Sequence, residues 1–349
     1  MINRILVALD GSALAEQVLP YVSTLAERSG ATVVLATAIT AGERWVDQAV
    51  TRQWEEEEQA AVQAYLTPIA ERFTESGVET RTRVQWGHPA DVLQAVADDE
   101  GANVIALTTH GRSGFVRWRT GSVADKLLRS ASTPVLLIHA QEAAPVERPA
   151  LRRILVPLDG SALAEAALPL VEDLAEQLGA SIILEQAVAP IAGLYAGELT
   201  PGSLPVLEDI QAAAGEYLAE CAKRIGHHGI KAETRIDFDY PASAIIEAAK
   251  AVGADLIALT THGRSGPERW IMGSVADAVV RHADAPCLVI PSRVLTQDET
   301  PEAPAENAAL LVGNAVVPPP VWSETPAVER PGPAEPGVRG HRPERSPGR

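Results

Sequence analysis

The chain repeats itself at an interval of about 150 residues, and this constrains its fold more than any other feature of the sequence. Residues 4–16 read RILVALDGSALAE and residues 153–165 read RILVPLDGSALAE, which agree at twelve of thirteen positions. The segment IALTTHGRSG at 105–114 recurs unchanged at 257–266. A repeat of this length is too long for a solenoid and indicates two copies of a whole domain.

The repeat and the composition divide the chain into four parts. We expect a first domain over residues 1–140, a linker over 141–150, a second domain over 151–292 and a Pro-rich tail over 293–349. Pro, Glu, Ala, Gly and Arg dominate the tail. Such a composition buries little apolar surface, so the tail is expected to be disordered or extended.

Short apolar runs alternate with helical patterns in both copies. The runs are expected to be strands at 5–9, 32–37, 79–85, 104–108 and 135–138, and at 154–158, 181–186, 231–237, 256–260 and 287–290. Strands that alternate with helices predict an α/β fold with a parallel sheet and right-handed crossovers. Pro20 and Pro169 lie inside the first helical pattern of each copy, where each is expected to cause a kink.

Charge and cysteine content exclude several classes of protein. A formal net charge of −17 argues against a nucleic-acid partner, because nucleic-acid binders usually carry a basic face. No run approaches the length of about 18 apolar residues that a membrane span requires, so no membrane partner is expected. The two cysteines, Cys221 and Cys287, lack metal-ligand spacing and suit a reducing compartment. We expect a soluble, cytoplasmic protein.

Two loops in each copy are expected to form a ligand site. In doubly wound sheets, ligands bind beyond the carboxyl ends of the strands, where the strand order reverses. One loop is Asp10-Gly11-Ser12, after the first strand, and its counterpart is Asp159-Gly160-Ser161. The other loop runs over residues 108–122, with a counterpart at 260–274. Asp10 and Asp159 could instead be turn residues that lead into a helix.

The second loop has the features of a phosphate cradle. Gly111 permits positive φ and a close approach of the backbone to a ligand. Gly121, Ser122 and Val123 then begin a helix, whose first amides have no partner within the helix and favour an anion. The counterparts in the second copy are Gly263, Gly273, Ser274 and Val275. The alternative is that these glycines serve only packing.

The motif resembles that of the universal stress protein family. Nucleotide-binding members carry Gly-x-x-Gly, nine residues, and then Gly-Ser or Gly-Thr. Here nine residues separate Gly111 from Gly121-Ser122, and nine separate Gly263 from Gly273-Ser274. The strand-one Asp-Gly-Ser and the segment Gly-Ser-Val-Ala-Asp strengthen the resemblance, which covers about residues 1–140 and 151–292.

The resemblance implies a fold and a ligand. Each domain would be a five-stranded parallel sheet of order 3-2-1-4-5, with ATP or a related adenine nucleotide at the switch point. Asp10 and Asp159 would lie near the adenosine, and the glycine loop would hold ribose and phosphates, often with Mg²⁺ on the phosphates. The backbone of Thr37 and Gln186 would meet adenine. The expected binding set also includes Ala8 and Pro157, at the ends of the first strands.

One position departs from the family motif. Its first glycine falls on Thr108 and Thr260, where a β-branched side chain could crowd the ligand or supply a hydrogen bond. Not all family members bind nucleotide, so one, both or neither copy could bind it.

No catalytic constellation stands out in the sequence. No Walker lysine follows either glycine loop, and the Ser, His and Asp residues lack a nucleophile elbow. His110 and His262 have no second ligand nearby, so no metal bound by the protein itself is expected. At most, slow ATP hydrolysis is expected.

These observations lead to one main functional hypothesis and two rivals. The main hypothesis is a nucleotide-responsive stress or signalling adaptor with an unknown protein partner. Its two domains would pair face to face, through their last strands, and a homodimer is left open. The rivals are a nucleotide-free interaction module of the same fold and an adenylating enzyme.

Overall fold

The computed structural model describes residues 1–40, 48–109, 121–140, 148–189, 203–261 and 272–291. Within this set we call residues 1–140 the first half of the chain and residues 148–291 the second half. Gly111, Gly263 and the predicted tail over 293–349 lie outside the described residues.

The two halves contain the same order of elements. The first half contains β1 (Arg4–Ala8), η1 (Ala15–Val18), α1 (Leu19–Ser29), β2 (Thr32–Ile39), α2 (Gln48–Glu75), β3 (Thr80–Trp86), α3 (Pro89–Glu100), β4 (Val104–Thr108), α4 (Ser122–Ser130) and β5 (Val135–Ile138). The second half contains β6 (Arg153–Pro157), α5 (Ala162–Glu165), α6 (Leu168–Leu178), β7 (Ser181–Ala187), α8 (Ser203–Gly226), β8 (Ala232–Asp237), α9 (Pro241–Val252), β9 (Leu256–Thr260), α10 (Ser274–His282) and β10 (Cys287–Ile290).

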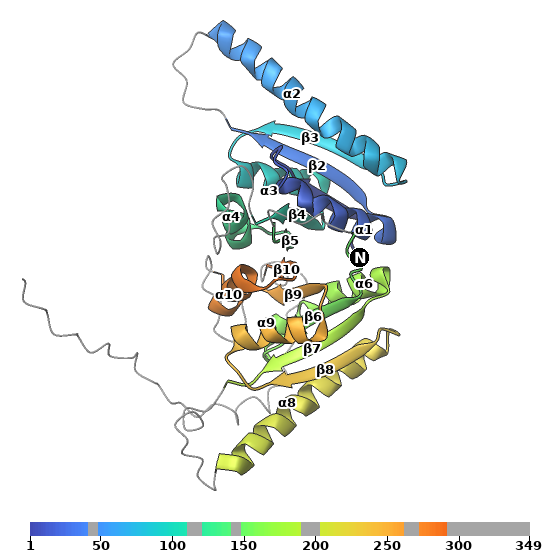
Figure 1. The fold of residues 1–349 in the computed structure, drawn as a ribbon, viewed down its shortest axis with the longest axis vertical. Coiled ribbons are helices and arrows are strands. Elements are labelled where there is room, and N and C mark those ends of the chain that lie inside the picture. The colour runs from blue at the N-terminus through green and yellow to red at the C-terminus, as the bar shows by residue number, and fades with distance from the viewer. Residues whose placement is uncertain (41–47, 110–120, 141–147, 190–202, 262–271, 292–349) are drawn as a thin grey trace, which may run out of the picture. The chain divides into compact units, whose positions relative to one another are not determined.

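The described strands form one ten-stranded sheet of order β3-β2-β1-β4-β5-β10-β9-β6-β7-β8. Within each half the strands are parallel, and their order is 3-2-1-4-5 as the resemblance implied. The expected fold is therefore confirmed for the described residues. Figure 1 shows β5 and β10 side by side at the junction of the halves.

The halves meet through an antiparallel pair of strands. Leu136 in β5 lies opposite Leu288 in β10, and Leu137 lies opposite Cys287. Leu136 and Leu288 are counterparts in the repeat, so the pairing is symmetric about them. The expected pairing through the last strands is confirmed, but the halves join edge to edge in one sheet and not face to face.

The first helical pattern of each half is broken before its proline. In the first half, η1 ends at Val18 and α1 begins at Leu19, with Pro20 in its first turn. In the second half, Pro169 occupies the same place in α6. Proline is tolerated there, because the first amides of a helix have no carbonyl to bond. The expected kink within a continuous helix was therefore wrong.

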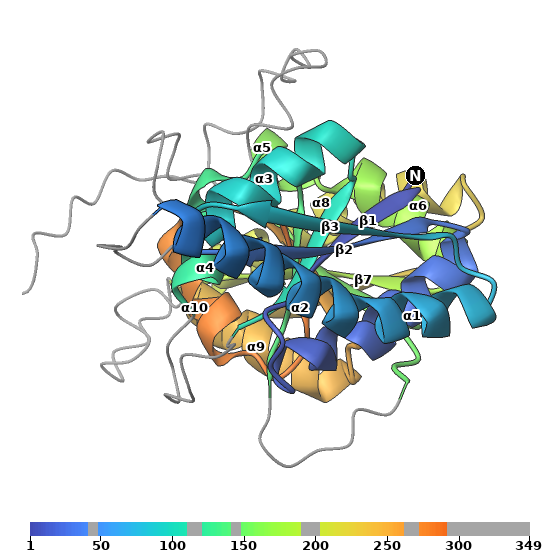
Figure 2. The same cartoon turned by 90° about the horizontal axis from the view of Figure 1, so that it is seen from above.

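Helices cover both faces of the sheet, as Figure 2 shows from above. The side chains of α1, α2, α6 and α8 pack on one face, and those of α3, α4, α9 and α10 pack on the other. Both layers continue from one half into the other. Paired residues on neighbouring parallel strands share a face, so the register assigns each strand side chain to one layer.

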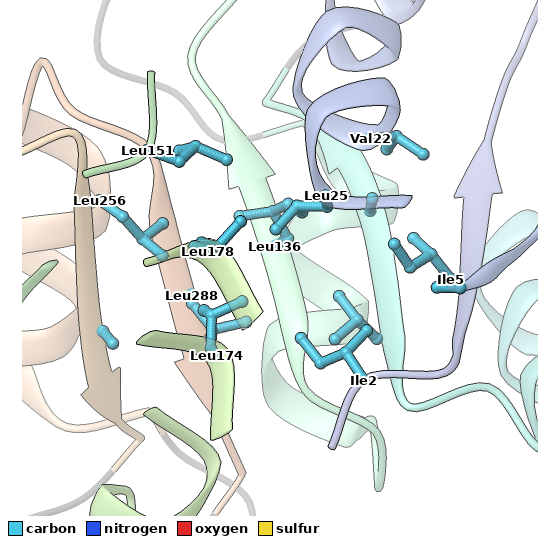
Figure 3. Close-up of a cluster of buried hydrophobic side chains, with 14 of the residues drawn as sticks. Ile2, Ile5, Val22, Leu25, Leu136, Leu151, Leu174, Leu178, Leu256 and Leu288 are labelled. Atoms are coloured by element: carbon cyan, nitrogen blue, oxygen red, sulfur yellow. The ribbon is translucent and has the colours of Figure 1, made fainter. Parts of the chain in front are cut away.

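The junction of the halves is aliphatic. Figure 3 shows Ile2, Leu25 and Leu136 of the first half facing Leu174 and Leu288 of the second, and all five are at most 5% exposed. Polar contacts lie beside this cluster: the Arg28 guanidinium donates to the Leu178 carbonyl at 2.6 Å, and the N-terminal amine pairs with Asp173. The two halves therefore share part of their core.

Removal of one leucine from this shared core is expected to destabilise both halves together. Leu288→Ala should lower the free energy of unfolding by about 2–5 kcal/mol, because it leaves a cavity that both halves line. Denaturant unfolding measured by circular dichroism would test this. Tyr240→Ala is the control, since Tyr240 is 62% exposed and should change stability by less than about 0.5 kcal/mol. Two separate transitions, with only one shifted, would contradict a shared core.

Candidate functional site

The turn after β1 is built by Asp10 and Ser12. The Asp10 Oδ1 atom accepts hydrogen bonds from the Ser12 amide at 3.0 Å and from the Ser12 hydroxyl at 2.6 Å. The Ser12 hydroxyl oxygen in turn accepts the Ala15 amide at 3.1 Å. The Leu9 amide donates to the Ala36 carbonyl at 2.9 Å, which holds the start of the turn beside β2.

The second half repeats this turn. Asp159 Oδ1 accepts from the Ser161 amide at 2.9 Å and from its hydroxyl at 2.6 Å. Ser161 caps α5, because its hydroxyl oxygen accepts the Ala164 amide at 3.2 Å. Both acids thus act as turn residues that lead into a helix, which the sequence analysis gave as the alternative to a ligand contact. A contact between either acid and adenosine stays a prediction.

The ends of the second predicted loop are joined by backbone hydrogen bonds. The Gly121 amide donates to the Thr109 carbonyl at 2.7 Å, and the Thr109 amide donates to the Ile138 carbonyl at 2.9 Å. In the second half the Gly273 amide donates to the Thr261 carbonyl at 2.8 Å. These bonds place the first turns of α4 and α10 directly at the carboxyl ends of β4 and β9.

The helices begin where the sequence predicted, at Ser122 and Ser274, each preceded by a glycine with φ of −59°. The Asp125 amide donates to the Gly121 carbonyl at 2.9 Å, which closes the first turn of α4. The amides of Ser122 and Val123 precede this bond and have no carbonyl to bond within the helix. They can serve a phosphate, since the helix dipole also favours an anion at this end.

The first side chains of α4 and α10 are accessible. In α4, Ser122 is exposed and Val123 is half-buried. In α10, Ser274 is exposed, and Val275 is 36% exposed. The described part of the predicted cradle is therefore exposed, whereas Gly111 and Gly263 lie outside the described residues.

Thr108 and Thr260, which stand where the family motif has its first glycine, point into the protein. Thr108 is 7% exposed and pairs in register with Ile138, on the face of the sheet covered by α1 and not the face of α4. Thr260 is half-buried and pairs with Ile290 in the same way. The two side chains therefore do not share a face with the helices whose first turns form the predicted cradle.

Buried polar atoms lie at the ends of the second strands of both halves. Neither the Thr37 Oγ1 atom nor the Gln186 Oε1 atom has a hydrogen-bond partner within the described part of the chain. Ala8 pairs in register with Ala36, and Pro157 pairs with Glu185. The residues expected to meet adenosine thus lie on adjacent strands in each half.

Glu185 is a buried acid that the sequence analysis missed. It is 0% exposed, and neither of its carboxylate oxygens has a hydrogen-bond partner among the described residues. Burial raises the pKa of Glu185 to about 8, the Asp237 carboxylate adds to this rise, and Arg235 opposes it. The signal was present in the repeat: the second copy reads SIILEQA where the first reads TVVLATA.

An ion-pair cluster connects the two helices that begin at the predicted cradles. Asp125 and Arg129 pair within α4, and Asp277 and Arg281 pair within α10, each across one turn. Between the halves, the Arg281 guanidinium lies 3.7 Å from the Asp125 carboxylate. The last turn of α10 therefore lies beside the first turn of α4.

The described residues contain neither a candidate metal cluster nor a candidate membrane span. Among the residues the structure describes, no group of three His, Cys, Asp or Glu side chains could hold a metal ion. Within the same residues, no helix has the length and apolar character needed to cross a bilayer.

The described residues define a tandem α/β protein in which each half has a doubly wound sheet and a helix that starts at the carboxyl end of its fourth strand. The model of the universal stress protein family matches residues 1–139 and 150–291. Because these matches cover most of the sequence, the chain belongs to the universal stress protein family.

Known relatives support this assignment. The chain is 25% identical, over 238 residues, to a universal stress protein of Mycobacterium tuberculosis, a match that covers 68% of this chain and 78% of the relative. It is 31% identical over 142 residues to one from Methanocaldococcus jannaschii, a match that covers 40% of this chain and 81% of the relative.

Solved structures support the fold. The crystal structure of a universal stress protein from Archaeoglobus fulgidus matches with a TM-score of 0.63 at 20% identity, and the match covers 84% of this chain and 99% of that one. A shorter structure, described as a universal stress protein in complex with cAMP, matches 40% of this chain and 98% of its own length with a TM-score of 0.32 at 24% identity, which supports no argument about this chain's ligand.

Because Glu185 is buried, we expect the free energy of unfolding to depend on pH. Because the pKa of Glu185 is raised to about 8 in the folded chain, its contribution to stability is fully present below about pH 4.5 and is lost as the pH rises towards 8. The loss should be on the order of a few kcal/mol. In Glu185→Gln, the unfolding free energy should change less between pH 5 and 8.5 than in the wild type. Equal pH profiles for the two proteins would contradict a neutral Glu185.

Proposed function

We propose that this chain binds ATP or a related adenine nucleotide and acts as a non-catalytic stress-response or signalling adaptor. One observation carries the proposal. In both halves a backbone hydrogen bond, from Gly121 to Thr109 and from Gly273 to Thr261, holds a helix start at the carboxyl end of a strand. Phosphate is a natural ligand for such a helix start.

Each predicted residue has a role in this proposal. The amides of Ser122 and Val123, and of Ser274 and Val275, would bind phosphates together with Gly111 and Gly263. Gly121 and Gly273, whose own amides donate to Thr109 and Thr261, would leave room for the phosphates because they carry no side chain. The adenosine would lie against the ends of the first two strands, at Ala8, Asp10 and Thr37 in the first half and at Pro157, Asp159 and Gln186 in the second. Thr108 and Thr260 would contribute only their backbone, because their side chains lie on the opposite face of the sheet from α4 and α10. Mg²⁺ would be carried by the phosphates.

Support for a non-catalytic role comes from the sequence. Phosphoryl transfer needs charge-neutralising groups around the γ-phosphate, and neither glycine loop is followed by a Walker lysine. The proposal therefore includes at most slow ATP hydrolysis. Bound nucleotide would bias the contacts of the two halves and so select an unknown protein partner. We place this activity in the cytoplasm, because two buried free thiols suit a reducing compartment.

A second candidate function is a nucleotide-free interaction module of the same fold. It is favoured by Thr108 and Thr260, which stand where the family motif has its first glycine. Mass spectrometry of small molecules released from the freshly purified protein distinguishes the two functions. An adenine nucleotide supports the binding protein, whereas its absence together with no binding of added ATP supports the module.

Blocking both helix starts is expected to abolish ATP binding. Because both glycines have φ of −59°, leucine at positions 121 and 273 is compatible with the backbone but would fill the space above the amides. In the double variant Gly121→Leu/Gly273→Leu, isothermal titration should show affinity for ATP reduced at least about tenfold, which is about 1.4 kcal/mol.

The matched control for this experiment is Gly226→Leu. A Cβ atom at Gly226, at the end of α8, would meet no atom within 4 Å, so the substitution should leave ATP binding unchanged. Unchanged affinity in the double variant would mean that the phosphates bind elsewhere. No heat with wild-type protein at millimolar ATP would refute the binding function itself.

A further inference from the structure

The two halves are alike where phosphate would bind and different where the base would bind. GSVAD, which begins α4, recurs without change at the start of α10. At the carboxyl ends of the first two strands, by contrast, Pro157 replaces Ala8, and Glu185 replaces Ala36. The second half thus has an acid where the first half has a methyl group.

Glu185 lies directly beside the predicted ligand crevice of the second half. It pairs in register with Pro157, the last residue of β6, and its carbonyl accepts the Leu158 amide at 2.8 Å. Asp159, the turn acid, follows one residue later. Ligands of doubly wound sheets bind beyond the carboxyl ends of the strands, and Glu185 directly precedes Gln186, the residue expected to meet adenine.

No group among the described residues donates a hydrogen bond to the Glu185 carboxyl. On β8, Arg235 and Asp237 face it, but the Arg235 guanidinium already donates two hydrogen bonds to Asp237, at 2.5 and 2.6 Å. On β6 its neighbour is Pro157, which is apolar.

The helix that covers Glu185 adds no charge. The side chains that α9 buries on this face are Ile245, Ala248 and Ala249, while its charged residues Glu247 and Lys250 are exposed. An ionised carboxylate at this depth, with no donor among the described residues, is strongly disfavoured.

We propose that the buried carboxyl of Glu185 makes ligand binding by the second half proton-dependent, so that the two halves respond differently to pH although their helix starts match. The inference rests on the proposed nucleotide binding. A bound nucleotide covers the strand ends beside Glu185 and brings the charge of its phosphates into the second half, and both effects favour the neutral acid. By reciprocity the neutral acid favours the nucleotide. Binding by the second half therefore takes up a proton near pH 8. The first half has Ala36 at this position, so its binding takes up no proton there.

The direction and size of the effect follow from this coupling. Affinity of the second half for ATP falls as the pH rises through the pKa of Glu185, which burial places at about 8. Couplings between sites usually change affinity by about 5- to 150-fold, so a fall of at least about fivefold between pH 7 and pH 9 is expected. The phosphate group itself ionises near pH 6 and contributes little in this range.

The experiment measures each half separately. Gly121→Leu blocks the first half, and Gly273→Leu blocks the second. Isothermal titration with ATP at pH 7 and pH 9 should show the fall in affinity in Gly121→Leu and no comparable fall in Gly273→Leu. Adding Glu185→Gln to Gly121→Leu should remove the fall. Adding Glu233→Gln, which neutralises an exposed acid on the neighbouring strand, should leave the fall in place.

Each other outcome counts against the inference. The same pH dependence with and without Glu185→Gln would overturn it, as would affinity that does not change with pH in Gly121→Leu. If wild type binds ATP but Gly121→Leu does not, the second half binds no ligand, and the inference fails while the proposed function stands. If the wild type binds no ATP at either pH, both fail. Retained binding at pH 7 in the Glu185→Gln variant confirms that it folds.

Discussion

The antiparallel pairing of β5 with β10 is the contact on which the rest of the structure depends. It places Leu136 opposite Leu288, its own counterpart in the repeat, and so relates the halves by a local two-fold symmetry. Both helical layers then continue across the junction, which buries an aliphatic cluster that neither half could cover alone. The same pairing brings α10 beside α4, where Arg281 lies 3.7 Å from Asp125.

This arrangement places the two predicted sites in one structural unit. Each helix start is held at a strand end by a backbone hydrogen bond, and each helix contributes to the ion-pair cluster between the halves. Exposed ion pairs are individually weak, so the shared apolar layers contribute more to the stability of the junction. The two helices contact each other directly through Arg281 and Asp125.

Much of the fold could be predicted from sequence because apolar runs, glycines and the repeat are local signals. The helix starts at Ser122 and Ser274 were predicted correctly on that basis. The break before Pro20 was not predicted, because the spacing of apolar residues is the same in one continuous helix and in two helices divided at a proline. The edge-to-edge junction was also not predicted, because an apolar strand such as Val135–Ile138 has the same sequence pattern at the edge of a sheet and within it.

The candidate site was less predictable, because its chemistry depends on burial. The sequence shows Glu185 only as one polar residue in a strand, whereas its complete burial in the fold raises the pKa of its carboxyl. The proposed function depends on phosphate binding by the first amides of α4 and α10, which ¹H–¹⁵N spectra recorded during ATP titration would test. We expect downfield amide shifts at Ser122, Val123, Ser274 and Val275 that saturate together with binding. Shifts confined to other residues would contradict phosphate binding at the helix starts.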